Sequence, residues 1–354
     1  MKIRKELAAV AAVGLLAGAL ALPAANATAF GCGVGSHHCY GVAHYKPSNV
    51  NAFGVDLWTN CLHLNTPSNR FATHETWYNT GSGTGFIETG YIKGFIPDID
   101  NPSTHFRYWW GERYMGGTYY GHFISLASVS TWVNFSMYRN ASTGKWGIYT
   151  GGTLRGTTAS AYPIGGDVQV GGETTDPYVY SYGASSNLQT RNASNGTWSF
   201  ATLYSILQDA DVYSTTGSGS YMTQTSLNNM CSSPLAAAKQ TAAAVEPPTA
   251  ANVRSEALAF AKANGDASPE SVQAVETTRK AVAGNQGVSS DQPVVSIQMK
   301  GDFTGAFASA APGGEPVKGG VLSVTLDKKT GEITDWSIGS ARQDLKKLGS
   351  VKAL

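Results

Sequence analysis

The sequence predicts an all-β sandwich of the jelly-roll type followed by a small α+β domain. The 354 residues include 41 Gly, 17 Tyr and 8 Trp, yet only 14% are charged, against about 25% in an average globular protein. Residues 30–232 consist of short runs of Tyr, Trp, Thr, Phe and Val separated by turn residues, with almost no helical period. The charge density rises afterwards: residues 30–234 hold 11 acids and 9 bases, whereas the shorter stretch 235–354 holds 12 acids and 13 bases.

Residues 1–29 have the pattern of a secretory signal peptide. Lys2, Arg4 and Lys5 precede an apolar run of 16 residues at positions 7–22, and Ala27-Thr28-Ala29 is a suitable cleavage site. The run is shorter than the about 20 residues that span a bilayer. We therefore expect a secreted, extracellular protein with no membrane association after removal of the signal.

The sandwich domain is assigned to residues 30–234, where alternating β-type residues predict about ten strands. The strongest strand signals lie at residues 53–60, 71–79, 85–95, 106–114, 118–127, 131–138, 145–149 and 167–173.

An Ala/Pro-rich linker is predicted at residues 235–251 and the small α+β domain at residues 252–354. That domain begins with a helical pattern at residues 250–263. Ser268 as N-cap, Pro269 in the first turn and Gly284 beyond the end predict a second helix. Strands are predicted at residues 294–299 and in a hairpin of residues 321–326 and 332–338.

The four cysteines remain after signal cleavage, and an even number in an exported protein predicts two disulfides. Among three possible pairings we favour Cys32 with Cys39 and Cys61 with Cys231. The alternative is a metal site, because His37, His38 and His44 lie near the first two cysteines, but the spacing does not fit a common zinc motif. We predict no metal.

The charge balance excludes several classes of partner. The formal net charge is +1, and no basic run follows the signal, so the chain lacks the electrostatic footprint of a nucleic-acid-binding protein. A nucleophile elbow, a phosphate-binding Gly-rich loop and a HExxH motif are all missing from the sequence. We therefore predict no cofactor, and an extracellular polypeptide or polysaccharide as the substrate.

Aromatic residues on the predicted strands are candidates for substrate binding, since Tyr and Trp combine apolar area with a polar tip. Their alternative role is to fill the core. His122 lies in a strand-like run and is a candidate to orient a carboxylate or substrate, or a structural imidazole. The candidate substrate-binding residues are Tyr108, Trp109, Trp110, His122, Trp132 and Tyr138.

Four acids are embedded in strand-like runs: Glu75, Glu88, Glu112 and Glu173. Glu88 shares its face with Phe86, Gly90 and Ile92, an apolar and small set in which an unpaired carboxylate is costly. Glu173 follows two glycines, which allow another backbone or a ligand to approach closely.

A pair of carboxyl groups can hydrolyse a bond when one donates a proton and the other activates water. Phe86-Ile87-Glu88-Thr89-Gly90 and Gly171-Gly172-Glu173 resemble the two active-site segments of glutamic peptidases, the neprosin-like and eqolisin-like enzymes, and Tyr108-Trp109-Trp110 resembles the aromatic segment between them. The resemblance implies a concanavalin-A-like sandwich and peptide hydrolysis at acidic pH by Glu88 and Glu173.

Two alternatives remain open at the level of the sequence. A jelly-roll glycoside hydrolase also uses two carboxylates, at a separation that sets its stereochemistry. A non-catalytic glycan- or protein-binding sandwich would use the aromatic residues and not the glutamates.

Overall fold

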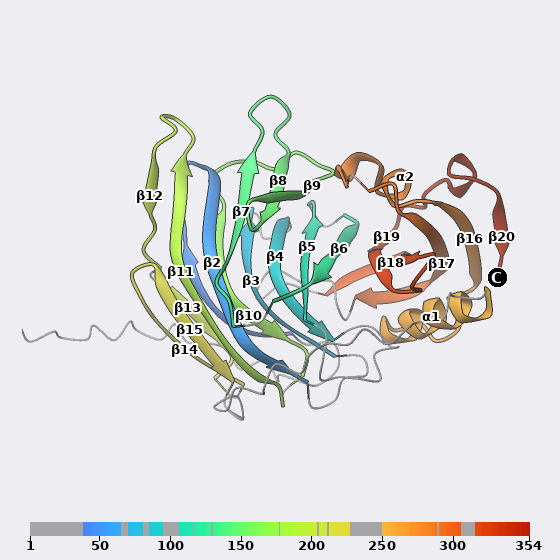
Figure 1. The fold of residues 1–354 in the computed structure, drawn as a ribbon, viewed down its shortest axis with the longest axis horizontal. Coiled ribbons are helices and arrows are strands. Elements are labelled where there is room, and N and C mark those ends of the chain that lie inside the picture. The colour runs from blue at the N-terminus through green and yellow to red at the C-terminus, as the bar shows by residue number, and fades with distance from the viewer. Residues whose placement is uncertain are drawn as a thin grey trace, which may run out of the picture.

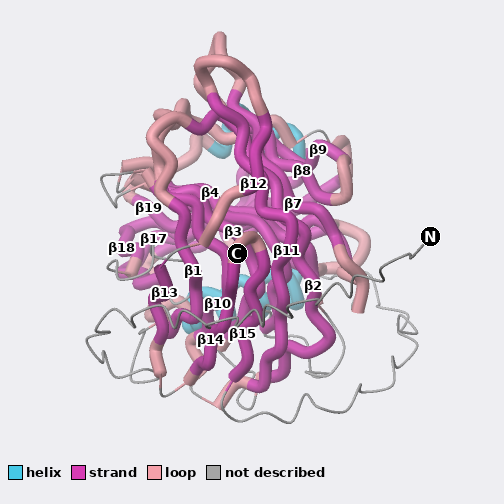
Figure 2. Tube along the Cα trace, turned by 90° about the vertical axis from the view of Figure 1, so that its left-hand side faces the viewer, coloured by secondary structure: helices cyan, strands magenta, loops and turns pink. Residues whose placement is uncertain are grey.

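The computed structural model describes residues 38–64, 70–80, 85–94, 106–115, 117–128, 130–176, 178–203, 205–210, 212–226, 250–288, 290–305 and 316–354. These residues form mostly antiparallel β-sheet, as the sequence predicts, and strands dominate the chain in both views (Figure 1, Figure 2). The predicted signal peptide and nearly all of the predicted linker lie outside the described residues, so both stay predictions.

The strands form two sheets (Figure 1). The 12-stranded sheet runs, from one edge to the other, through β13 (Ser205–Gln208), β1 (Cys39–Tyr45), β10 (Asp167–Thr174), β3 (Phe71–Asn79), β4 (Phe86–Gly94), β5 (Arg107–Arg113), β6 (Tyr119–Leu126), β19 (Ile333–Gly339), β18 (Val317–Asp327), β17 (Pro293–Gly305), β16 (Ser271–Thr278) and β20 (Val351–Ala353). The 8-stranded sheet runs through β14 (Tyr213–Ser218), β15 (Tyr221–Ser226), β11 (Tyr180–Asn192), β2 (Val50–His63), β7 (Val133–Arg139), β8 (Trp146–Thr150) and β9 (Thr153–Thr157), with β12 (Trp198–Phe200) paired to β11.

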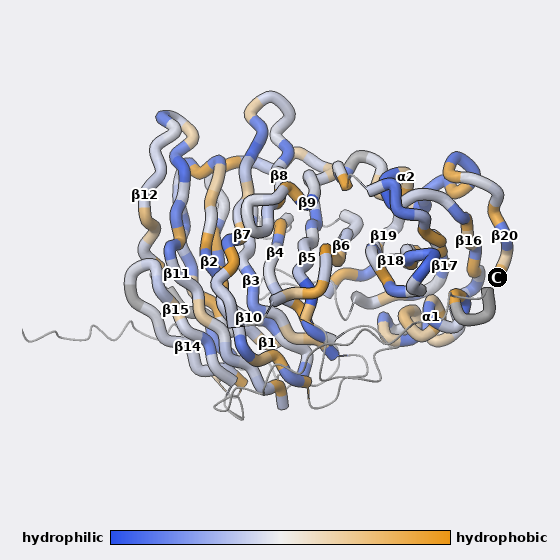
Figure 3. The backbone as a smooth tube through the Cα atoms, viewed as in Figure 1, coloured by the Kyte–Doolittle hydropathy of each residue, from blue (hydrophilic) through white to orange (hydrophobic). Residues whose placement is uncertain are grey.

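Strands β2 to β8 and β10 coincide with the predicted runs, apart from small shifts at their ends. Apolar and polar residues alternate along many of these strands (Figure 3), which is the pattern that a pleated strand requires when its two faces differ. The sequence signals did not single out β11, because its residues are mostly Ser, Gly, Asn and other weak strand formers.

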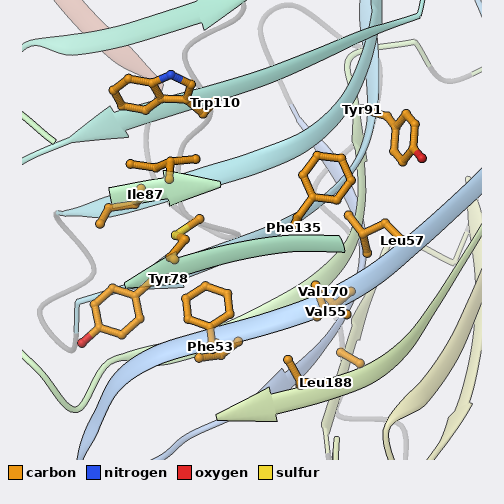
Figure 4. Close-up of a cluster of buried hydrophobic side chains, with 14 of the residues drawn as sticks. Phe53, Val55, Leu57, Tyr78, Ile87, Tyr91, Trp110, Phe135, Val170 and Leu188 are labelled. Carbon is orange, nitrogen blue, oxygen red and sulfur yellow. The ribbon is translucent and has the colours of Figure 1, made fainter. Parts of the chain in front are cut away.

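One apolar core lies between the two sheets. Phe53 and Phe135 of the 8-stranded sheet meet Ile87, Tyr91 and Trp110 of the 12-stranded sheet there (Figure 4). This core holds the sandwich together.

A second core lies on the other face of the 12-stranded sheet, which we call the outer face. It joins Trp77, Trp109 and Tyr119 of the sandwich strands to Phe260 and Trp336 of the C-terminal residues, and no residue of the 8-stranded sheet belongs to it among the described residues. At β5 and β6 the outer face packs against Trp336, which contacts Trp109, Tyr119 and Phe123.

The C-terminal strands continue the 12-stranded sheet, because β19 pairs with β6. Helix α1 (Ala250–Ala263) forms where the sequence predicts it and contacts β17 and β18 (Figure 1). The predicted strands at residues 294–299, 321–326 and 332–338 are likewise confirmed as parts of β17, β18 and β19. Neither described helix has the length and apolarity that a membrane crossing requires.

The predicted second helix of the C-terminal region is wrong over most of its length. Ser271–Thr278 form β16, and only Arg279–Ala283 form a short helix, α2, which ends at Gly284. The β-branched residues Val272 and Val275 favour a strand, and β16 gains backbone hydrogen bonds from β17 on one side and β20 on the other. Tertiary pairing here overrides the capping signals.

Candidate active site: a cluster of three buried glutamates

Three glutamates from neighbouring strands converge on the outer face of the sheet. Glu173 comes from β10, Glu75 from β3 and Glu88 from β4, and these strands are adjacent in the order β10-β3-β4. One carboxylate oxygen from each lies within 4.8 Å of the other two. All three side chains are fully buried, at 0% exposure. The structure thus brings together the two glutamates that the sequence singled out and adds a third.

Glycines on the neighbouring strands make room for these side chains. A Cβ atom at Gly90 would lie 2.4 Å from the Cβ atom of Glu75, and one at Gly111 would lie 2.6 Å from Oε1 of Glu88. A Cβ atom essentially never lies this close to a non-bonded atom, so a side chain at Gly90 would displace Glu75 and the adjoining His74 backbone, and one at Gly111 would displace Glu88 and the Tyr119 hydroxyl. The cluster therefore depends on glycine in β4 and in β5.

Glu88 accepts hydrogen bonds from two aromatic side chains. Trp77, its cross-strand partner in β3, donates from Nε1 to Oε2 at 3.0 Å. Tyr119 of β6 donates its hydroxyl to Oε1 at 2.8 Å. Burial, followed by the negative charge of Glu88, raises the pKa of Tyr119 well above its usual range. Tyr119 therefore stays protonated and remains a donor.

Glu173 also accepts two hydrogen bonds from side chains. His38 donates from Nδ1 to Oε1, and the Tyr40 hydroxyl donates to the same oxygen at 3.1 Å. Thr73 of β3 fixes the backbone, because its Oγ1 accepts the Glu173 amide N–H at 3.1 Å.

Glu75 differs from the other two, because neither of its buried carboxylate oxygens accepts a hydrogen bond of normal geometry from another described residue. Burial, together with the charges of Glu88 and Glu173, raises the pKa of Glu75 well above its usual range, while the Thr73 hydroxyl acts in the opposite direction. Neutral Glu75 can donate a proton, whereas Glu88 and Glu173 already accept hydrogen bonds. The cluster therefore combines one protonated carboxyl with two acceptors.

The spacing of the cluster suits a shared water molecule. Hydrogen bonds between oxygens span about 2.8 Å, so two oxygens that hold one water lie at most about 5.6 Å apart. The 4.8 Å limit meets this condition. Three carboxylate oxygens at this spacing also suit a divalent cation, since Mg²⁺ and Ca²⁺ prefer oxygen ligands.

The predicted substrate-binding aromatics are distributed over different surfaces. Trp109 belongs to the outer-face core, whereas Trp110 and Tyr108 pack in the core between the sheets. Trp132 and Tyr138 are 47% and 41% exposed and lie at β7 in the 8-stranded sheet, away from the glutamates. Of the predicted set, only Trp109 shares a core with the residues that contact the glutamates.

His122 also lies away from the glutamates. It alternates along β6 with Tyr119 and Gly121, so its side chain is on the face opposite to that of the cluster. Its ring stacks on Trp110 at a centroid distance of 4.1 Å, and its Nδ1 donates to Asp335 at 2.7 Å.

The cysteines are only partly within the described residues. Cys39 and Cys61 are not free thiols, whereas Cys32 and Cys231 lie outside the described ranges, so the pairing stays a prediction. Of the histidines in the alternative metal site, His37 lies outside the described residues, His38 contacts Glu173, and His44 contacts Asp167 at 2.8 Å.

C-terminal residues pack beside the cluster. The ring of Trp336 lies against Gly121, where a Cβ atom would be 2.2 Å away, and packs 6.2 Å from the ring of Tyr119, the donor to Glu88. Phe260 of α1 packs in turn on Trp336 at 6.5 Å. These contacts link α1 to the immediate surroundings of the glutamates.

Sequence reasoning missed Glu75 as a member of the site, together with the donors Trp77, Tyr119, Tyr40 and His38. The available signal was the period of two in β3, which puts Glu75 on the same face as Trp77. The strand order that brings β3 between β10 and β4 was not available from the sequence.

Comparisons with known proteins find distant similarity of structure. Neither a family model nor a curated protein matches the sequence. Scytalido-glutamic peptidase with a peptide-based transition-state analogue is similar at 10% identity and a TM-score of 0.40, over 54% of this chain and 99% of that chain. SCP-B, a member of the eqolisin family of peptidases, is similar at 11% identity and a TM-score of 0.35, over 54% and 99%. The Bacillus licheniformis β-glucanase is similar at 11% identity and a TM-score of 0.25, over 51% and 68%.

Proposed function

We propose that the protein is a secreted hydrolase that cleaves peptide bonds at acidic pH with a carboxyl centre formed by Glu75, Glu88 and Glu173. The observation that carries this proposal is the meeting of three chain-distant carboxyl groups within 4.8 Å of one another in a buried site. Burying charged groups is costly unless they are paired or protonated. We therefore expect a cluster of three buried carboxyl groups to have a functional role.

The hydrolysis follows from the different surroundings of the three groups. Glu173, which accepts from His38 and Tyr40, takes a proton from the attacking water as the water oxygen bonds to the carbonyl carbon. Glu88 holds the water from its other side. Protonated Glu75 gives its proton to the amide nitrogen, and the carbon–nitrogen bond breaks to release a carboxylic acid and an amine. The proton on Glu173 then restores Glu75.

The spacing of the carboxyl groups argues against a glycoside hydrolase that works by inversion. Inverting glycosidases hold their two carboxyl groups about 6.5 to 9.5 Å apart, with a water between one carboxylate and the sugar. One oxygen of Glu88 and one of Glu173 lie within 4.8 Å of each other, which is shorter than the inverting separation and near the about 5 to 5.5 Å of a retaining glycosidase. They are close enough to share a proton or a water, as the carboxyl pair of an acid peptidase does.

Access to the glutamates requires a movement, because the three side chains have no exposed surface. Trp336 packs on Tyr119, which donates to Glu88, and Phe260 packs on Trp336. We propose that the C-terminal residues move away from the outer face when substrate binds.

The test is digestion of a denatured protein between pH 3 and 7 by wild type and by the Glu88→Gln and Glu173→Gln variants. Glu112→Gln is the matched control, since Glu112 is also buried on the same sheet but on the opposite face. We expect loss of about 10²-fold or more in rate for the two site variants and no loss for the control.

Two further arms of this test distinguish the alternatives. Equal rates of proteolysis by wild type and all three variants would show that these glutamates do not catalyse the cleavage. Release of sugar from a polysaccharide panel without proteolysis would support a glycoside hydrolase instead. Inhibition by a chelator, reversed by a divalent cation, would show that the glutamates act as metal ligands.

A further inference from the structure

A cavity of about 290 Å³ lies where β6 of the sandwich meets β19 of the C-terminal residues. Tyr120 and His122 of β6 line it, and these residues point away from the glutamate cluster. Its other walls come from β18, β19, α2 and the segment 341–343. The cavity is therefore a site separate from the one described above.

Asp335 and Arg279 fix the proton position on His122 at the cavity wall. Arg279 donates to Asp335 from Nε at 2.8 Å and from Nη2 at 2.9 Å. Burial alone would raise the pKa of Asp335, but Arg279 and His122 together hold it well below its usual range. The ionised Asp335 accepts the Nδ1 hydrogen of His122 at 2.7 Å.

His122 consequently presents an unused acceptor. Burial is the main cause that lowers the pKa of His122, so the ring is neutral and its Nε2 carries a lone pair. That atom is buried and has no hydrogen-bond partner within the described ranges, in a side chain that is only 2% exposed.

Gln286 presents an unused donor on the same cavity. Its side chain is 5% exposed, and its Nε2 is buried without a hydrogen-bond partner. A buried polar group left unsatisfied costs about 1 to 3 kcal/mol. One acceptor and one donor, both unsatisfied on one cavity, indicate a ligand that carries hydroxyl groups.

The charge at the cavity indicates an acidic ligand. Arg342 lines the cavity and is exposed, and it makes no ion pair with another described residue. The lining carboxylate, Asp335, is neutralised by Arg279. The remaining positive charge favours a carboxylate on the ligand.

We propose that this cavity binds a small hydroxylated carboxylic acid of monosaccharide size, such as a sugar acid. One hydroxyl group donates to Nε2 of His122, another oxygen accepts from Nε2 of Gln286, and the carboxylate lies against Arg342. The volume is at the lower end of the range for small-molecule sites and is several times that of one water, about 30 Å³.

The test is calorimetric titration of the full chain with D-glucuronate, with D-glucose as the uncharged probe. We expect saturable binding of glucuronate that weakens about tenfold in Arg342→Gln. The control Lys346→Gln, at an exposed residue outside the cavity lining, should leave it unchanged.

A second readout uses the ¹⁵N NMR signals of His122 in the wild-type protein, which avoids a substitution at a buried position. Binding should shift the Nε2 signal while Nδ1 remains protonated. The proposal is wrong if glucuronate shows no saturable binding, if Nε2 does not respond, or if Arg342→Gln binds as well as wild type. Equal binding of glucose would also contradict it, because the carboxylate would then have no role.

Discussion

Glu75 is the glutamate of the cluster whose carboxyl group is least stabilised by hydrogen bonds. Its two oxygens accept no hydrogen bond of normal geometry from the described part of the chain, while Glu88 and Glu173 next to it accept hydrogen bonds from Trp, Tyr and His side chains. A buried carboxyl beside two others remains neutral more easily than it becomes the third negative charge. This asymmetry assigns the proton of the cluster to Glu75.

A stability measurement tests this assignment through Glu75→Gln. Because the folded pKa of Glu75 is raised, the folded protein keeps a proton that the unfolded chain releases above about pH 4.3. Wild type should therefore lose stability relative to the variant as the pH rises from there, and the two should converge at lower pH. Urea unfolding at pH 4 and pH 8 measures the difference. An unchanged difference at the two pH values would show that Glu75 is ionised in the folded protein.

Glu112 gives a second prediction with a defined pH window. Burial is the main cause that raises the pKa of Glu112 from 4.5 to about 7. Glu112→Gln should gain up to about 3 kcal/mol of stability over wild type between pH 4.5 and 7. The gain should be absent below pH 4. A pH-independent effect would mean that the substitution acts through the hydrogen bonds of Glu112 to Ala159 and Tyr162 instead.

At the scale of elements, the alternation along single strands was predictable and the order of strands was not. The period of two correctly placed Glu88 on the same strand face as Phe86 and Ile92. It also placed Trp109 and Trp110 on opposite faces of their strand. The meeting of Glu173 with Glu75 depends on β10 pairing with β3 across about a hundred intervening residues. Local residue patterns do not encode that pairing, because it is set by how the whole sheet closes.

β16 shows a different limit of sequence reasoning. Ser268, Pro269 and Gly284 are good helix-boundary residues, yet the segment between them lies mostly in a strand. The capping residues report local preference, whereas the backbone hydrogen bonds from β17 and β20 come from distant residues. Only the last turn before Gly284 follows the local signal.

The junction of β6 and β19 yields a prediction for Gly121. A Cβ atom at this position would lie 2.2 Å from the ring of Trp336. Gly121→Ala should therefore destabilise the protein by about 1 to 3 kcal/mol through overpacking. Thermal unfolding measures the change, with Gly320→Ala in β18 as the control, because Gly320 has no positive φ and a Cβ atom there would meet only the Gly301 carbonyl oxygen at 3.8 Å. A smaller loss for Gly121→Ala than for the control would contradict the close packing at the junction.

On the scale of the whole molecule, the C-terminal residues do two things at once. They extend the 12-stranded sheet through β19, and they place α1 against the outer-face core in which the residues around the glutamates are buried. The residues around the glutamates therefore share one packed core with the C-terminal region.

Phe260→Ala tests the role of this shared core. Loss of the Phe260 ring removes a contact with Trp336 and should cost about 3 to 5 kcal/mol of packing. If the C-terminal residues restrict access, the variant should cleave a peptide faster than wild type at a temperature where both are folded. Leu345→Ala is the control, since Leu345 is buried in the C-terminal region but belongs to neither core. Faster cleavage by both variants would mean that general destabilisation of the C-terminal region raises the rate, and not the loss of the Phe260 contact in particular.

The most direct test of the central claim is a ¹³C NMR titration of the glutamate side-chain carboxyl groups. If Glu75, Glu88 and Glu173 act as one centre, the signal of Glu75 should titrate well above the usual range for a glutamate. Substitution of Glu88 by Gln should move that titration toward lower pH, because it removes a neighbouring negative charge. Titration of Glu75 in the usual range for a glutamate, unaffected by Glu88→Gln, would contradict a shared carboxyl centre.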